Sequence, residues 1–438
     1  MQKILLLIAS LFYFNFILAE NEIKSWQGIH ETPLSCLEQQ FAEPPVEFAN
    51  HVIWGWEGKM DKKTICNDLD SIKKKGFRAV IFEAGYKLPF KYLSEEWFKA
   101  IRTGVLEAKK RGMKVWIIDE GKYPSGFAGG KFSQERPDLR MQALVIGDTI
   151  QIKRGEVMTN HKIAPEIISA VAVSTSGAPN RTVAINNGEI SFNAGLDDWK
   201  VLLVKSDFRT AVTRAVNNPN GGKDATNSLC DYLNPIAVQQ FIDWTHEQYK
   251  KYLGKELGTT VLGFRGDEPD YAHLPWTPSI VQTFKETKGY DPTPYLASFF
   301  TASPTIQEQR VKADYWDVWS SLFATHFFKL QADWCAANGV AHITHLNKEH
   351  EMPACVKAEG DYFRNLSKVQ IPGVDAIWNQ IWPGTLNDFP KLASSVAHVY
   401  GKPRAFSESF AAYHISPTIP QAKFVVDHQI ARGINFFE

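Results

Sequence analysis

The sequence predicts an α/β protein built on a (β/α)8 TIM barrel, with a β-rich insertion after the third strand. Short apolar runs recur along the chain, and each ends in polar or small residues before a charged stretch of helical period. This alternation is typical of βα units around a parallel sheet. Eight such runs can be counted, which is the number that a barrel needs.

The first three units lie in the N-terminal third of the chain. We expect strands over 51–56, 79–83 and 113–120, with helices over 62–75 and 94–111. From 144 to 216 the pattern changes to short β-branched runs separated by Gly, Asn, Ser and Pro, which indicate hairpins. Helical period returns over 235–253. The β-rich insertion, 144–216, is therefore expected between the third strand and its helix, inside a barrel domain of 20–438.

The remaining five strands follow at wider spacing. We expect them over 260–266, 340–345, 374–379, 404–408 and 434–437, with helices over 306–338, 389–400 and 421–432. A barrel strand is normally followed by a covering helix, but the sequence ends at Glu438, directly after the eighth strand. We expect either a longer natural protein or a fragment.

The N-terminus and the composition favour export and a neutral ligand. Lys3 is followed by an apolar run from Ile4 to Leu18 and then Ala19, which predicts a signal peptide over 1–19 and a secreted or periplasmic location. The 48 basic residues balance the 48 acidic ones, so we expect no nucleic-acid partner. No later apolar run is long enough for a membrane span, so we expect no membrane partner. The five cysteines show no CxxC spacing, which argues against a cysteine metal site.

Carboxylates recur where the predicted strands end. Because the βα loops of a barrel converge at the C-terminal ends of its strands, residues there can meet in one pocket. Five of the eight strands end in Asp or Glu, although a ring of like charges costs stability. The candidates are Trp56, Glu83, Asp119, Glu120, Asp267, Glu268, His345, Trp378, Asn379 and Glu408, with Trp54 and Glu438 beside them. A carbohydrate substrate is the partner that such a pocket predicts.

Two carboxyl groups are enough for glycoside hydrolysis, one to protonate the leaving oxygen and one to activate water or to attack the sugar. We expect Glu268 and Glu408 to be this catalytic pair and the other eight candidates to bind substrate. The alternatives are an N-cap role for Glu268 and a buried carboxylate bridged to an arginine for Glu408. Only one residue of Asp119 and Glu120 is expected to face the pocket, because adjacent strand residues point to opposite faces.

Three further features have structural alternatives. His345 and the nearby His342 could contact sugar hydroxyls or a metal, or could be hydrogen-bonded structure. Trp56 and Trp378 could stack on sugar rings or pack in the core. The glycine-rich segment 123–130 lacks the phosphate-binding patterns, so we interpret it as a shaped substrate loop.

Several motifs in order resemble a known family. They are Trp116 to Gly130 with its Asp-Glu and Tyr-Pro-Ser-Gly, Gly263 to Pro269, Gly360 to Asp375, and Ser407-Glu408 followed by 427–435. This set resembles the bacterial glycoside hydrolases related to the α-L-rhamnosidases of family 106. The resemblance implies an inverting mechanism, a calcium ion, Glu268 as the general acid or its partner, and Glu408 as the opposing carboxylate. It also implies further domains beyond Glu438. Arg265 departs from the pattern, where a smaller or apolar residue is expected.

The sequence therefore predicts a secreted glycoside hydrolase that cleaves a terminal sugar, with α-L-rhamnose as the sugar that the resemblance suggests, from polysaccharide. The alternative is a non-catalytic carbohydrate-binding barrel or an inactive truncated fragment. A metal-dependent hydrolase using His342 and His345 is a third hypothesis. The residues themselves indicate no certain cofactor and leave the stereochemical outcome open.

Overall fold

The computed structural model describes residues 33–44, 48–121, 123–210, 213–214, 223–224, 228–271, 274–385, 387–413 and 417–438. The predicted signal peptide, 1–19, lies outside them. In this part of the chain, no helix is both long and apolar enough to span a membrane.

Eight parallel strands form one sheet that curls into a nearly closed barrel. In spatial order they are β1 (His51–Trp56), β2 (Ala79–Ala84), β3 (Lys114–Ile118), β13 (Val261–Gly266), β15 (Ala341–Thr344), β16 (Ile371–Ala376), β17 (Phe406–Ser409) and β18 (Phe436–Phe437). The rings of His51 and Phe436 meet edge to face, with centroids 4.3 Å apart, so the first and last strands come together. The predicted fold class is confirmed.

The strands are apolar on both faces because one face fills the barrel and the other is covered by helices. Ile81, Trp116 and Ile343 belong to the interior cluster. Phe82 and Val115, each one residue away from an interior neighbour, pack outward in a second cluster with the helices. Helices of the outer layer are α3 (Lys62–Lys74), α4 (Glu95–Lys110), α6 (Pro235–Trp244), α7 (His246–Leu253), α10 (Lys329–Ala337), α13 (Pro390–Val399) and α14 (Ile419–Ile430).

Local capping explains where several helices begin. The Asp61 carboxylate accepts a hydrogen bond from the Thr64 amide at 2.9 Å at the start of α3, and Ser94 caps α4. Thr305 and Glu308 form a capping box before α9 (Ile306–Leu322). The predicted helix over 306–338 is α9, a π-helical turn over Phe323–Phe328, and α10 in succession.

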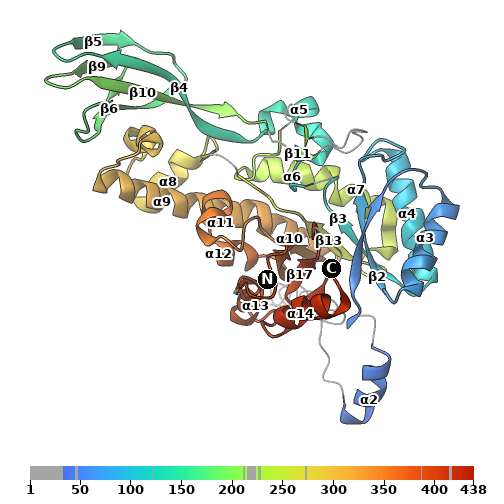
Figure 1. The fold of residues 1–438 in the computed structure, drawn as a ribbon. Coiled ribbons are helices and arrows are strands. Elements are labelled where there is room, and N and C mark those ends of the chain that lie inside the picture. Colours follow the sequence, from blue (N-terminus) through green and yellow to red (C-terminus); the bar gives the residue numbers. More distant parts are fainter. Residues whose placement is uncertain are drawn as a thin grey trace, which may run out of the picture.

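The β-rich insertion projects away from the barrel (Figure 1). Its strands are β4 (Gln142–Ile152), β5 (Val157–Lys162), β6 (Ile167–Ser174), β7 (Arg181–Val183), β8 (Ile185–Asn186), β9 (Glu189–Asn193) and β10 (Trp199–Phe208). They form two antiparallel sheets around their own apolar cluster. A short strand after the fourth barrel strand, β14 (Pro275–Trp276), pairs with β4, so the insertion is joined to the barrel on both sides. The domain limits 20–438 and 144–216 remain predictions.

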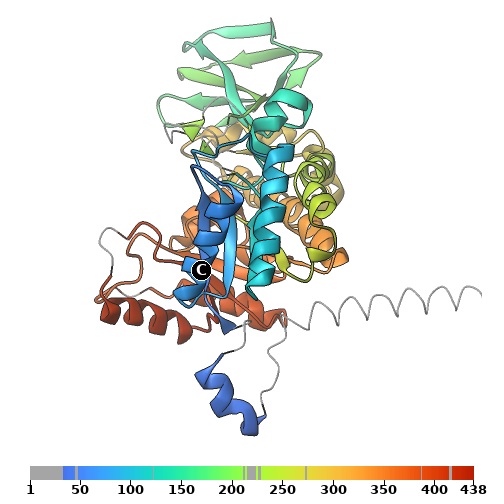
Figure 2. The same cartoon turned by 90° about the vertical axis from the view of Figure 1, so that its right-hand side faces the viewer.

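Further helices fill the long connections of the second half. They are α8 (Ile280–Lys288), a 3-10 segment over Thr293–Phe300, α11 (Met352–Glu359) and α12 (Tyr362–Leu366). An unpredicted helix, α2 (Leu34–Ala42), has no buried residue and extends from the barrel (Figure 2).

The sixth strand differs from its predicted limits. It spans Ile371–Ala376 rather than 374–379. Pro372 and Gly373 hide its start in the sequence, although Gly373 is required because an added Cβ would lie 2.1 Å from the Phe406 ring. As a result Asp375 lies on the strand, while Trp378 and Asn379 lie in the loop that follows, both with left-handed backbone (φ 55° and 58°).

Candidate active site

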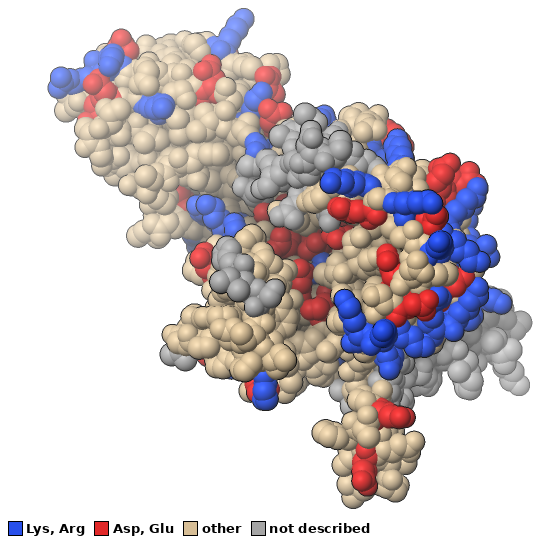
Figure 3. Space-filling view, turned by 45° about the vertical axis from the view of Figure 1, so that its right-hand side comes forward, with Lys and Arg blue, Asp and Glu red and all other residues tan. Residues whose placement is uncertain are grey.

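The C-terminal ends of the strands surround an acidic hollow. Figure 3 shows acidic side chains lining a depression in the middle of the molecule. Five elements contribute carboxyl groups that interact with one another, from residues Asp119, Asp267, Glu268, Asp375, Glu408 and Glu438. The barrel therefore brings together most of the acidic residues that the sequence places at the ends of the predicted strands.

Arg265 lies at the centre of this cluster and contacts Glu408, so the alternative expected for Glu408, a buried carboxylate bridged to an arginine, describes its contact in the structure. Its side chain is fully buried on β13. Its Nη1 lies 3.0 Å from Oδ1 of Asp267 and its Nε donates to Oε2 of Glu438 at 3.0 Å. Its Nη2 contacts Oε2 of Glu408 and lies 3.1 Å from Nε2 of His345. One guanidinium thus contacts three carboxylates.

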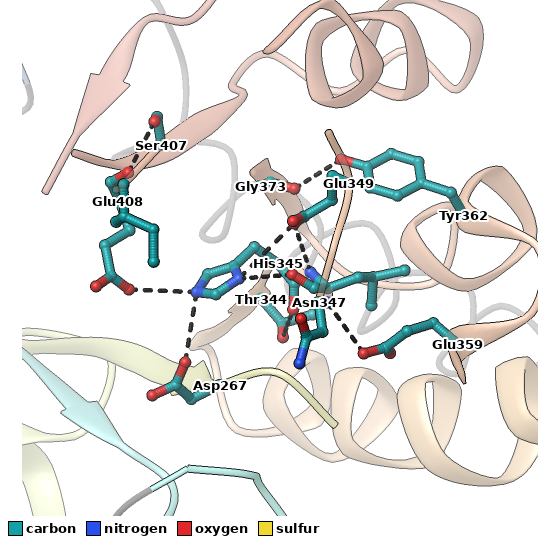
Figure 4. Close-up of polar contacts among 12 residues, drawn as sticks. Asp267, Thr344, His345, Asn347, Glu349, Glu359, Tyr362, Gly373, Ser407 and Glu408 are labelled. Carbon is teal, nitrogen blue, oxygen red and sulfur yellow. Dashed lines mark hydrogen bonds and ion pairs between the residues drawn. The ribbon is translucent and has the colours of Figure 1, made fainter. Parts of the chain in front are cut away.

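Asp267 and Glu408 are held ionised by their neighbours. Burial alone would raise both pKa values, but the Arg265 charge and the His345 ring hold the pKa of Asp267 and of Glu408 below the usual range. Figure 4 shows the His345 ring between the two carboxylates, with Nε2 at 3.4 Å from Oδ1 of Asp267 and 3.3 Å from Oε2 of Glu408.

His345 is fixed from its other side as well. Its Nδ1 donates to the carbonyl of Leu346 at 3.1 Å, which leaves Nε2 for the two carboxylates. Burial opposes protonation, but bonds to Asp267 and Glu408 raise the pKa of His345 well above its usual value. The imidazole is therefore a second cationic partner of these acids.

Glu268 has the opposite electrostatic environment. Burial, followed by repulsion from Asp267, raises its pKa to about 7. Its carboxylate lies within 4.8 Å of ligand atoms of His345 and Asp375. The side chain is partly exposed, and its backbone φ of 39° is strained for a residue other than glycine. Strain of this kind persists only where surrounding structure enforces it.

Asp119 and Glu120 are both buried, but they face different surroundings. Asp119 accepts a hydrogen bond from Ser125 Oγ at 2.7 Å, and burial raises its pKa to about 7, with repulsion from Asp267 acting in the same direction. Glu120 accepts bonds from the amides of Gly121 at 2.6 Å, Gly129 at 3.2 Å and Ala128. Asp119 is thus the member of the pair that interacts with the cluster, while Glu120 holds a loop.

The other four sequence-based candidates differ in where they lie. Trp56 is fully buried between β1 and α4, against Phe82 and Trp97, so its expected stacking on a sugar does not fit its position. Glu83 is partly buried on β2, two residues after Ile81 of the interior cluster, so it faces the barrel interior at the C-terminal end of its strand. Trp378 is 55% exposed and Asn379 is partly exposed, both in the loop after β16.

His342 and His345 do not converge. His345 is three positions after His342 and directly follows β15, so the two side chains point to opposite sides of the sheet. His342 lies near His246 of α7, whose ring packs on Phe264 and Trp334 in the outer layer. The hypothesis of a metal site that uses both histidines is therefore wrong in its geometry.

Sequence reasoning missed three acids of the site. Asp375 is paired in register with Glu408, and burial raises its pKa well above the usual value. Glu349 accepts from the Leu346 amide at 2.9 Å and Glu359 accepts from the Asn347 amide at 3.0 Å, which shapes the loop after β15 (Figure 4). Correct limits for the sixth strand would have identified Asp375, whereas the other two lie on loops and helices without a local signal.

The calcium ion implied by the resemblance does not fit the two triads whose ligand atoms lie within 4.8 Å of one another. Those triads are Asp267, His345 and Glu408, and Glu268, His345 and Asp375. Calcium takes about six to eight oxygen ligands, but each triad includes an imidazole, and Arg265 already contacts both carboxylates of the first. We assign no metal to these described side chains.

Comparisons with known proteins agree with this fold. A family model described as alpha-L-rhamnosidase, of glycoside hydrolase family 106, matches residues 160–437. A Formosa agariphila protein named putative beta-glucuronidase is 24% identical over 457 aligned positions, which cover 92% of this chain and 37% of that protein. The solved structure of a rhamnosidase from Novosphingobium sp. PP1Y superposes with a TM-score of 0.67 at 16% identity, covering 93% of this chain and 56% of that one.

This chain therefore spans about a third of the curated relative and about half of the solved rhamnosidase. The structural likeness, at such low identity, shows the shared fold. The family match covers more than half of the chain and includes four of the central carboxylates, those of Asp267, Glu268, Asp375 and Glu408. The chain belongs to glycoside hydrolase family 106, the alpha-L-rhamnosidase family.

Proposed function

We propose that this chain is a glycoside hydrolase that removes a terminal α-L-rhamnosyl residue from a polysaccharide, using Glu268 and Glu408. Its family is described by alpha-L-rhamnosidase activity, and the names of both similar proteins are those of glycosidases. The apolar segment of residues 4–18 supports export of the enzyme to where polysaccharides are found.

The opposite pKa shifts of two carboxyl groups in one hollow carry this proposal. Burial and repulsion from Asp267 raise the pKa of Glu268 to about 7, so a large fraction of it is protonated near neutral pH. Arg265 and His345 keep the pKa of the buried Glu408 below its usual range, so it is ionised at the same pH. Environments that separate two pKa values in this way assign one group as acid and the other as base.

The proposed reaction follows from these two states. The Glu268 carboxyl gives its proton to the glycosidic oxygen while the bond from that oxygen to the anomeric carbon breaks. Glu408 accepts a proton from a water whose oxygen forms the new bond to the same carbon. The products are the free sugar, with inverted configuration, and the shortened polysaccharide. Both carboxyl groups regain their starting states when they exchange one proton with solvent.

Other side chains have supporting roles in this proposal. Asp267 lies next to Glu268 and is partly exposed, so it offers an oxygen to sugar hydroxyls. Trp378 exposes more than half of its surface and Asn379 is partly exposed, both in the loop after β16, so they are candidates for contacts with the sugar chain. His345 and Arg265 hold Glu408 in its ionised state.

Replacement of Glu268 tests the proposal. Glu268→Gln should lower kcat on phenyl α-L-rhamnoside by roughly 10²–10⁴-fold, because the amide cannot donate the proton. Circular dichroism should show an unchanged fold. Asp231→Asn is the matched control, since Asp231 is a buried acid whose pKa burial raises to about 7, but it binds Thr277 and Tyr271 outside the hollow. Wild-type turnover in Glu268→Gln would refute the assignment.

Product analysis tests the remaining choices. Proton NMR of the first product formed should show the inverted anomer. Release of another sugar in preference to rhamnose, across a panel of aryl glycosides, would refute the proposed substrate. Binding of rhamnose oligosaccharides without turnover by the wild-type protein would favour the non-catalytic barrel instead.

A further inference from the structure

The glycine-rich loop after β3, residues 123–130, is part of the scaffold rather than an open substrate loop. Ser125, Phe127 and Ala128 are almost completely buried. Gly126 has a φ of +100°, and an added Cβ would lie 2.6 Å from the Tyr232 ring, so only glycine fits there. The Glu120 carboxyl group accepts hydrogen bonds from the Ala128 and Gly129 amides in the turn of the loop. The loop is fixed from both ends.

Ser125 joins this loop to the end of β13 through both backbone groups of Asp267. The Ser125 amide donates to the Asp267 carbonyl at 2.8 Å. The Asp267 amide donates to Ser125 Oγ at 2.7 Å, and that hydroxyl donates its own proton to Oδ1 of Asp119 at 2.7 Å. The hydroxyl is therefore satisfied as acceptor and donor at once, which leaves it a single orientation.

We call the two hydrogen bonds between Ser125 and the Asp267 backbone the Ser125 clasp. Tyr232 supports this clasp from the side of the aromatic core. The Tyr232 hydroxyl donates to the Ser125 carbonyl, and the neighbouring Cys230 amide donates to the Gly126 carbonyl at 2.9 Å. Tyr232 itself is fully buried and packs on Tyr271 and Phe323. Movement of Ser125 would therefore disturb a packed aromatic core.

Glu268 follows Asp267 directly and has the strained φ of 39°. Strained backbone persists only where neighbouring contacts enforce it. The Ser125 clasp holds both backbone groups of Asp267 and can therefore enforce the strained φ of the next residue, Glu268. We propose that Ser125 is a positioning residue that holds the Asp267–Glu268 backbone so that the Glu268 carboxyl points at the glycosidic oxygen. This inference rests on the proposed role of Glu268 as the acid.

A leaving-group comparison tests it. If Ser125→Ala misplaces the acid, kcat should fall by roughly 10-fold or more for phenyl α-L-rhamnoside, whose leaving group needs a proton, as part of the 10²–10⁴-fold that acid catalysis supplies. With 2,4-dinitrophenyl α-L-rhamnoside, whose leaving group departs without a proton, kcat should stay near the wild-type value. A purely structural role would lower both rates alike.

Matched variants separate the possible outcomes. Thr277→Val removes another buried hydroxyl that donates to a buried carboxylate, Asp231 at 2.7 Å, outside the hollow; it should affect both substrates equally or not at all. Tyr232→Phe removes only the support of the Ser125 carbonyl, and should give the Ser125→Ala pattern in weaker form if Ser125→Ala does not fold.

Glu268→Gln distinguishes failure of this inference from failure of the proposed function. A leaving-group dependence in Glu268→Gln, but not in Ser125→Ala and Tyr232→Phe, would overturn the positioning role alone. No leaving-group dependence in Glu268→Gln would overturn the assignment of the acid itself. The same dependence in all three variants is the expected result.

Discussion

Replacing Arg265 with methionine should move the acidic limb of the pH–rate profile to higher pH. Activity requires an ionised Glu408, so kcat/KM falls when the pH drops through the pKa of that group. In the wild-type protein, burial raises this pKa, but the Arg265 guanidinium and His345 outweigh burial and hold it below the usual range. Removing the guanidinium removes an opposing charge in direct contact, so the pKa must rise.

The size of the shift follows from the contact. An opposite charge within hydrogen-bonding distance lowers a carboxyl pKa by about 1–3 units, and each unit corresponds to about 1.4 kcal/mol. The acidic limb of Arg265→Met should therefore move up by about 1–3 units. Arg265 also lowers the pKa of Glu268, but it is a minor cause there and the main lowering cause for Glu408, so the basic limb moves up less and the two limbs approach each other. The profile should become narrower and its maximum lower.

The same substitution leaves Asp267, Glu408 and Glu438 without their shared cation. Loss of one partner of a buried ion pair costs about 3–5 kcal/mol of stability. The folded fraction therefore needs to be measured at each pH by circular dichroism. Arg265→Lys offers a milder test, since lysine keeps the charge but cannot bridge several carboxylates with a planar fork. Its limb should lie between those of the wild-type and methionine proteins.

The assay is kcat/KM for phenyl α-L-rhamnoside from about pH 4 to 9, a range that covers both limbs. Arg364→Met serves as the control, because Arg364 of α12 also pairs with an aspartate, Asp317 of α9 at 2.7 Å, and neither residue is one of the acids around Arg265. An acidic limb at the wild-type position in a folded Arg265→Met protein would refute the reasoning.

Two further predictions concern buried residues. Trp56→Ala should lower the free energy of unfolding, measured in urea, by about 3–5 kcal/mol, because removal of a fully buried indole leaves a cavity. The KM should not change. A raised KM with normal stability would restore Trp56 as a sugar-stacking residue. Burial raises the pKa of Glu120 to about 8, so its contribution to stability is complete below about pH 4.5 and is lost as pH rises through 8. Between about pH 5 and 9, the free energy of unfolding of Glu120→Gln should therefore fall by a few kcal/mol less than that of the wild-type protein. If both proteins lost the same free energy of unfolding over this pH range, Glu120 would be ionised in the folded protein.

The order of strands and helices could be predicted because its signals are local. Apolar runs of strand length end at polar residues, and side chains such as Asp61 and Ser94 cap the helices that follow. The convergence of acids on one hollow was also predictable, because a barrel brings the C-terminal ends of all strands together. Both inferences need only the sequence near each element.

Side-chain direction was harder to predict, because each barrel strand is apolar on both faces. On β1 the ring of His51 lies inside the barrel beside Phe436. Alternation then places residues 53 and 55 inside the barrel and Trp56 outside it. Because Val52 and Ile53 are both apolar, the sequence does not indicate which of them faces the interior. The separation of His342 from His345 has the same cause.

The charge states of the hollow could not be predicted from any one segment. Arg265 stands out in the sequence as a departure from the family pattern, yet its position explains why so many acids can meet. Around its guanidinium, Asp267 and Glu408 are ionised, although burial raises the pKa of the third partner, Glu438, to about 7. Away from it, burial raises the pKa of Glu268, Asp375 and Glu349. A glycosidic oxygen needs a proton on one side and a base on the other, and the boundary between these two groups of acids supplies both.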